Sequence, residues 1–148
     1  MGRGRAAVIR IAFLYLMLFT AFIARAEDDP ASYIGMSLEE LLIQFGTPES
    51  VYPVRGLEEW QDDVVFVYEE GDFYILKDRV WQVGLKTAYR VNTGDPSTVV
   101  YLSFGEAFMA GRDFAVFSLG RQNWPLALRC NFDLAGRVTA IFIYRSDI

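Results

Sequence analysis

Two segments of similar layout, 59 residues apart, constrain the fold of this 148-residue chain more than any other feature. They cover residues 35–46 and 94–105, and in each a glycine stands at both ends, 11 positions apart. A phenylalanine, Phe45 or Phe104, directly precedes each closing glycine. Because the offset is close to half of the 122 residues that follow Ala26, the layout predicts two copies of one structural unit.

The first segment predicts a short amphipathic helix. Ser37 is a good N-cap, and Glu40 three residues later completes the capping-box pattern. The leucines that follow recur at helical spacing. Gly46 and Pro48 then favour a helix end, because glycine suits the turn after a helix and proline does not continue one.

The second segment predicts a matching helix. Asp95 can cap it, and Pro96 can occupy the first helical position, where the missing N–H of proline costs nothing. Each half of the chain is therefore expected to begin with one helix.

Three β-rich runs follow each predicted helix. They cover residues 64–68, 73–77 and 80–86 in the first half, and 114–119, 126–132 and 138–145 in the second. The predicted fold class is α+β, with two tandem α-β-β-β units whose helices pack on one face of an antiparallel sheet. Such a sheet leaves its other face to water or to a partner.

The first 26 residues predict a secretory signal. Arg3, Arg5 and Arg10 precede a 14-residue apolar run over residues 11–24, whereas a membrane-spanning helix needs about 20 residues. A short apolar core behind basic residues is typical of a signal peptide, and the small residues that follow favour cleavage after Ala26. No cysteine stands near this point to carry a lipid anchor.

The predicted organisation is a cleaved signal peptide over residues 1–26, a first unit over 27–90 and a second unit over 91–148. We expect the mature protein to be periplasmic or secreted after Sec-type export, without a stable membrane anchor. All 19 acidic residues but only ten of the 14 basic ones lie after Ala26, which gives the mature part a net charge of −9. Nucleic acid is therefore excluded as a partner, and a basic protein is favoured.

The sequence offers little for catalysis. The chain contains no histidine, the commonest general base and zinc ligand. Acidic pairs stand at residues 39–40, 58–59, 62–63 and 69–70, and their spacing favours a solvated surface over a calcium site or a hydrolase that uses Asp62 or Asp63. The lone thiol of Cys130 is interpreted as core filling rather than as a reactive group. We expect no enzyme activity, no cofactor and no bound metal.

Aromatic residues are the more informative excess, at 16% of the chain. Exposed Trp and Tyr side chains commonly anchor protein interfaces. The candidate partner-binding residues are Trp60, Tyr74 and Trp124, and a loop tryptophan that caps its own core is the competing interpretation for Trp60 and Trp124. On strand alternation, we expect Trp81 to face the helix and Val80 and Gln82 to face the other side.

The glycine, Met-Ser, amphipathic turn and Phe-Gly-Thr-Pro string, followed by a β-meander, resembles the SmpA/OmlA (BamE) family. Its tandem form resembles the β-lactamase-inhibitor-protein-like (BLIP-like) fold. The residues that carry the resemblance are Gly35, Met36, Ser37, Leu41, Phe45, Gly46 and Pro48, with Gly94, Pro96, Phe104 and Gly105 in the second copy. The resemblance implies a helix on an antiparallel sheet, no catalysis, and contacts with other proteins in envelope assembly or enzyme inhibition.

Two functions from different classes remain open at this point. The first is an exported, non-enzymatic module that binds another envelope or secreted protein. The alternative is a periplasmic protein that binds a small molecule or a cell-envelope ligand by aromatic stacking.

Overall fold

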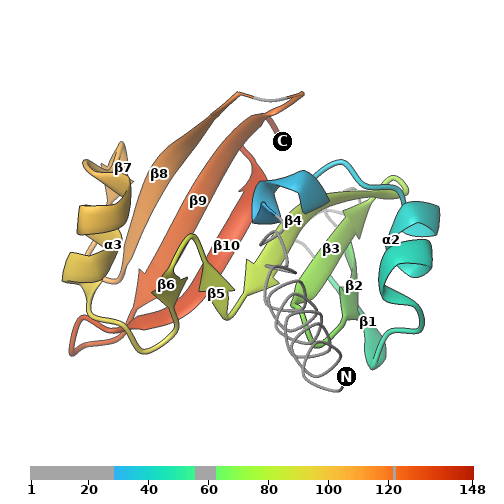
Figure 1. Ribbon diagram of the computed structural model, residues 1–148, viewed down its shortest axis with the longest axis horizontal. Coiled ribbons are helices and arrows are strands. Elements are labelled where there is room, and N and C mark those ends of the chain that lie inside the picture. Colours follow the sequence, from blue (N-terminus) through green and yellow to red (C-terminus); the bar gives the residue numbers. More distant parts are fainter. Residues whose placement is uncertain (1–28, 56–62, 122) are drawn as a thin grey trace, which may run out of the picture.

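The computed structural model describes residues 29–55, 63–121 and 123–148 (Figure 1). Its helices are the 3₁₀-helix η1 (Pro30–Tyr33) and the α-helices α2 (Leu38–Phe45) and α3 (Ser97–Phe104). The strands of the first half are β1 (Ser50–Val54), β2 (Asp63–Val67), β3 (Asp72–Leu76), β4 (Arg79–Leu85), β5 (Thr87–Ala88) and β6 (Val91–Asn92). Those of the second half are β7 (Met109–Ala110), β8 (Phe114–Arg121), β9 (Pro125–Phe132) and β10 (Val138–Arg145).

Eight of these strands form one antiparallel sheet in the order β1-β2-β3-β4-β10-β9-β8-β7. Strands β4 and β10 join its two halves at the centre, where Gly84 pairs with Phe142 and Val83 pairs with Ile143. The prediction of two tandem α-β-β-β units is therefore wrong. The strands merge into one large sheet, because β4 of the first half and β10 of the second half pair with each other through their backbones. The boundary expected after residue 90 falls in the turn between β5 and β6.

The prediction also missed the two edge strands, β1 and β7. All five residues of β1 are exposed, and it contains Pro53, which removes a backbone donor and argues against a strand. An edge position tolerates this proline because one row of N–H groups there has no neighbouring strand. Strand β7 has only two residues, too few for an alternating pattern.

Both α-helices cover the same face of the sheet, which we call the helix face. Phe45 of α2 lies with its ring centroid 5.2 Å from that of Phe73, and Phe104 of α3 lies 5.4 Å from Phe117. Phe73 and Phe117 occupy one row of paired residues that crosses β3, β4, β10, β9 and β8, so their side chains share a face.

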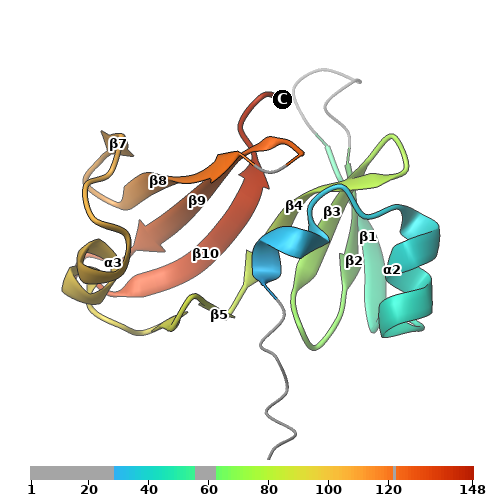
Figure 2. The ribbon, with the colours of Figure 1, turned by 45° about the horizontal axis from the view of Figure 1, so that its top comes forward.

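The segments η1 and β5–β6 fill the space between the two helices on this face (Figures 1 and 2). Their buried residues belong to the same hydrophobic core as the strands, and they are Ala31, Ile34, Ala88 and Val91. The turn residue Tyr89 joins them, since its hydroxyl donates to Asp29 Oδ1 at 2.6 Å and its ring meets that of Phe104 edge-on. The core thus lies in one layer between the sheet and these covering segments.

Helix α2 begins as its sequence predicts. The Ser37 hydroxyl accepts from the Glu40 N–H at 3.2 Å, and the Glu40 carboxylate accepts from the Ser37 N–H at 2.7 Å, which is a complete capping box. Helix α3 differs from the prediction. Its N-cap is Pro96 without a side-chain cap, because the Asp95 carboxylate instead accepts from Asn92.

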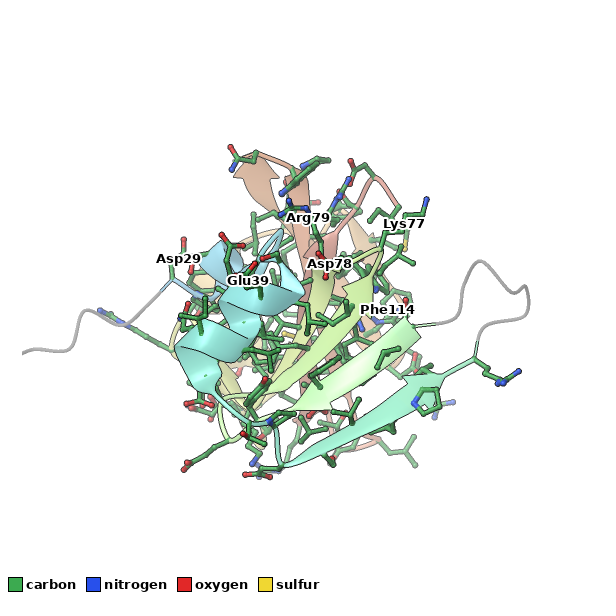
Figure 3. The ribbon with its side chains drawn as sticks, turned by 90° about the vertical axis from the view of Figure 1, so that its right-hand side faces the viewer. Asp29, Glu39, Lys77, Asp78, Arg79 and Phe114 are labelled. Carbon is green, nitrogen blue, oxygen red and sulfur yellow. The ribbon has the colours of Figure 1, made fainter. Side chains whose placement is uncertain are left out.

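Arginine side chains at the turns of two hairpins hydrogen-bond to the segments that precede α2 and α3. The β3–β4 turn is formed by Lys77 and Asp78, both with positive φ, one residue earlier than expected. The Arg79 guanidinium donates to the Gly35 carbonyl at 2.8 Å, and Asp78 and Arg79 lie beside the start of α2 (Figure 3). In the second half Arg137 donates to the Gly94 carbonyl at 2.9 Å.

The predicted signal peptide lies outside the described residues. In the described ranges no helix has the length and apolar character needed to cross a membrane.

We predict that Ser37→Ala destabilises the protein by about 1 kcal/mol, because it removes the side-chain acceptor of the α2 capping box. Ser97→Ala is the matched control, since α3 has no side-chain cap, and should change stability by less than about 0.5 kcal/mol. Urea denaturation followed by circular dichroism measures both. Equal losses would contradict the assigned cap.

A second prediction concerns pH. Hydrogen bonds from the backbone and then the side chain of Ser37 lower the pKa of Glu40 below its ordinary 4.5. The lowered pKa means that this stabilisation is fully present above pH 4.5 and is lost as pH falls through the folded-state value. The stability difference between wild type and Glu40→Gln should therefore be larger at pH 6 than at about pH 3. A pH-independent difference would contradict it.

Candidate functional site

The face of the sheet opposite the helices is the candidate site, and we call it the open face. Two rows of paired residues define it. One row is Tyr52, Val65, Tyr74, Gln82, Tyr144, Ala127 and Ser118, and the other is Val67, Asp72, Gly84, Phe142, Arg129, Val116 and Met109. None of the described helices, nor the β5–β6 hairpin, packs against these rows, because their core contacts lie on the helix face.

Trp81 also belongs to the open face, contrary to the sequence prediction. A β-bulge shifts the register between Tyr74 and Ile75, so that Val80 pairs with Ile75 and Gln82 pairs with Tyr74. Val80 and Val83 are both fully buried in the core on the helix face. The two residues between them are left on the other side, because a bulge adds a residue that breaks the alternation.

Trp81 and Tyr74 form the centre of the first half of this face. Their ring centroids lie 6.5 Å apart in an edge-on arrangement. The Trp81 Nε1 atom is buried and has no hydrogen-bond partner. Burial raises the pKa of Tyr74, and repulsion from an ionised Tyr52 and from the Asp72 and Asp63 carboxylates raises it further. This part of the face is thus aromatic, and Asp63 and Asp72 give it acidic character.

The second half of the open face carries its own cation. The Arg129 guanidinium lies 4.5 Å from the ring centroid of Phe114, and its Nε donates to Asn131 Oδ1 at 2.8 Å. Phe114 and Asn131 pair directly and continue the same face. Figure 3 shows Phe114 on the side of the sheet away from α2. The two halves therefore differ in charge.

The three predicted partner-binding residues do not form one surface. Tyr74 lies on the open face, whereas Trp60 lies outside the described residues. Trp124 packs against the core on the helix face, with the Arg145 guanidinium 3.9 Å from its ring centroid. A Cβ atom on Gly35 would stand 2.6 Å from Trp124 Nε1, so the indole fills the space beside that glycine. For Trp124 the core-capping interpretation is the one the structure supports.

The predicted structural-motif residues stand at the ends of the helices and in the core beneath them. Gly46 and Gly105 are the C-caps of α2 and α3, with φ of 76° and 79°. Gly35 and Gly94 have φ of 91° and 92°, a conformation that side chains disfavour. Phe45 and Phe104 pack against the core, and Pro48 is half-buried.

The described members of the predicted acidic pairs are exposed, with one exception. Glu39, Glu69 and Glu70 are exposed, whereas Asp63 is only 9% exposed, so the expectation of a solvated surface is wrong for Asp63. It lies on the open face two residues before Val65, and that position is not evident from a pair of adjacent acids. Among the described residues no group of three or more acidic or cysteine side chains could hold a metal ion.

Comparison with known proteins finds similarity in fold. No family model matches the chain, and no curated protein matches it. A cysteine-rich secretory protein from Staphylococcus aureus matches with a TM-score of 0.53 and 12% identity over 82% of this chain. An extracellular protein containing an SCP domain, from Bacillus anthracis, matches with a TM-score of 0.52 and 14% identity over 82% of this chain. The chain spans 47% of the length of each.

These matches contradict the resemblance to the SmpA/OmlA (BamE) and BLIP-like families and to their tandem repeats. The structures that are similar to this chain come from SCP-type proteins. The residues that carried the resemblance act locally, since a glycine after a helix and a capping serine set where a helix begins and ends. Such requirements are shared by unrelated folds and do not identify one.

We predict that Gly35→Ala costs about 1–3 kcal/mol more stability than Gly94→Ala. Both glycines have the same positive φ, so backbone strain is matched, but only at Gly35 would the new Cβ meet Trp124. Chemical denaturation followed by circular dichroism measures the difference. Equal losses would show that Trp124 does not occupy this position.

Cys130 is fully buried in the core, which confirms its interpretation as core filling. Burial raises the pKa of its thiol to about 12, and the thiolate is the reactive form. Iodoacetamide at neutral pH should therefore leave the folded protein unmodified and should alkylate it fully in guanidinium chloride. Mass spectrometry distinguishes the two, and rapid alkylation of the folded protein would contradict the assignment.

Proposed function

We propose that this chain is an exported, non-enzymatic module that binds another protein through the open face of its sheet. The observation that carries the proposal is the asymmetry of the sheet. Every described helix and the β5–β6 hairpin cover the helix face, while the open face presents a set of aromatic side chains. They are Tyr52, Tyr74, Trp81, Phe114, Phe142 and Tyr144.

Partly exposed aromatic rings on a rigid sheet suit protein recognition. They bury large areas and lose little conformational freedom on binding, which is why tyrosine and tryptophan are enriched at interfaces. Between the rings lie small or buried residues such as Val65, Ala127 and Val116, each at most 3% exposed. The rings are therefore supported from below and keep a fixed arrangement.

Export is supported by two independent observations. The N-terminal basic residues and short apolar run have the pattern of a secretory signal. The two similar structures belong to a secretory and an extracellular protein. The partner is then another envelope or secreted protein, and the net charge of −9 in the part after Ala26 favours a basic one.

Two other surfaces compete with the open face. The outer sides of the helices expose Ile43 at 78% and Leu102 at 86%. The edge strand β1 exposes Val51 and Tyr52, but Pro53 interrupts its free row of N–H groups and disfavours the addition of another strand. The helices are therefore the surface that an experiment has to separate from the open face.

Site-specific photo-crosslinking in the producing cells provides this separation. A photoreactive phenylalanine analogue replaces Tyr144 or Ser118 on the open face, and Ile43 or Leu102 on the helices in matched controls. We expect the open-face positions to give one discrete protein adduct and the helix positions to give none.

The other outcomes identify the error. An adduct from Ile43 or Leu102 alone would place the interface on the helices and contradict the proposal. An open-face adduct whose added mass is a glycan or lipid, and not a protein, would favour the alternative of a cell-envelope ligand.

A further inference from the structure

We infer that the first half of the open face receives an arginine side chain of the partner protein. This inference rests on the proposed function and names the chemistry of the contact. The residues involved are Tyr52, Tyr74, Trp81 and Asp72, which we call the acidic aromatic patch.

The patch extends across the four strands β1 to β4. Tyr52, Val65 and Tyr74 pair in one row, so the two tyrosines stand two strand spacings apart, about 10 Å. Val65 between them is fully buried, which leaves the neighbouring rings to form the surface. Trp81 meets Tyr74 edge-on, and Asp72 stands two residues before Tyr74 on the same side of β3.

The acidic residues that strands β2 and β3 place on the open face are Asp63 and Asp72, whereas the nearby cations, Arg55, Lys77, Arg79 and Lys86, lie at the ends of the strands. The Arg79 guanidinium is directed to the Gly35 carbonyl beside α2 and so does not neutralise the patch. A partner that brings a positive charge to this half is therefore favoured electrostatically.

Two other aromatic rings of this protein lie in contact with arginine side chains. Arg129 covers Phe114 in the second half of the open face, and Arg145 covers Trp124 on the helix face. No cation–π contact involves Tyr74 or Trp81 among the described residues. A guanidinium group fits these rings because it stacks on aromatic faces and is weakly hydrated, and the Asp72 carboxylate can accept its N–H groups.

The test is a titration with the peptide acetyl-Gly-Arg-Gly-amide, followed by the indole N–H signals in nitrogen-15 NMR. The chain has three tryptophans, and Trp81→Phe identifies the Trp81 signal by its loss. The control peptide carries citrulline, which has the shape of arginine without its charge. We expect the arginine peptide to shift the Trp81 signal, and citrulline to bind roughly two- to fivefold more weakly.

Matched variants locate the contact. Asp72→Asn and Tyr74→Leu should each weaken arginine binding roughly two- to fivefold, because each removes one favourable interaction with the guanidinium. Ser97→Ala, on helix α3 and outside the open face, should leave it unchanged. Binding should also weaken as sodium chloride is raised. Unaltered amide spectra outside the patch confirm that each variant is folded.

Three results would overturn the inference: equal binding of the citrulline peptide, no shift of the Trp81 signal, or a shift caused by a neutral oligosaccharide and not by arginine. This failure is distinguishable from failure of the proposed function. Open-face crosslinks to a protein without arginine binding would overturn only the inference. Arginine binding with crosslinks confined to Ile43 and Leu102 would overturn only the proposed interface.

Discussion

The pairing of β4 with β10 is the constraint on which the rest of the structure depends. It joins residues 82–85 to residues 141–144, so the two four-stranded halves become one sheet with two continuous faces. Because Phe73 and Phe117 then share a face, both helices, η1 and the β5–β6 hairpin pack on the same side. No helix of the described residues covers the opposite face, which carries aromatic rings from both halves of the chain.

Local signals in the sequence were sufficient for the two α-helices and for six of the strands, but not for η1. The capping box of α2 and the β-rich run at residues 126–132 depend on neighbours in the chain, and both are predicted correctly. The sheet as a whole was not predictable in this way, since the β4–β10 ladder joins residues far apart in sequence. A strict alternation of side chains also does not predict the bulge beside Tyr74. This bulge places Trp81 on the side of the sheet opposite to that expected.

The same limit applies to the candidate site. The sequence identifies aromatic residues as the informative excess, but it does not tell which rings the protein uses for itself. The Trp124 ring contacts the Arg145 guanidinium and fills the space beside Gly35, whereas Tyr74 lies on the open face. The prediction for Asp63 fails in the opposite direction. The acidic pair at residues 62–63 was expected to be solvated, but Asp63 is buried. Register across the sheet decides each of these cases.

The central position of β4 has a consequence for how the chain emerges during synthesis or export. Residues 141–144 emerge after β4, and until they do β4 is the unpaired edge of an incomplete sheet. An exposed strand edge invites pairing with other chains. Gly94 likewise hydrogen-bonds to Arg137 and to the backbone of Val138, so the segment before α3 gains these contacts only after β10 begins to emerge. We therefore expect the first half to present an unpaired strand edge until the second half is made.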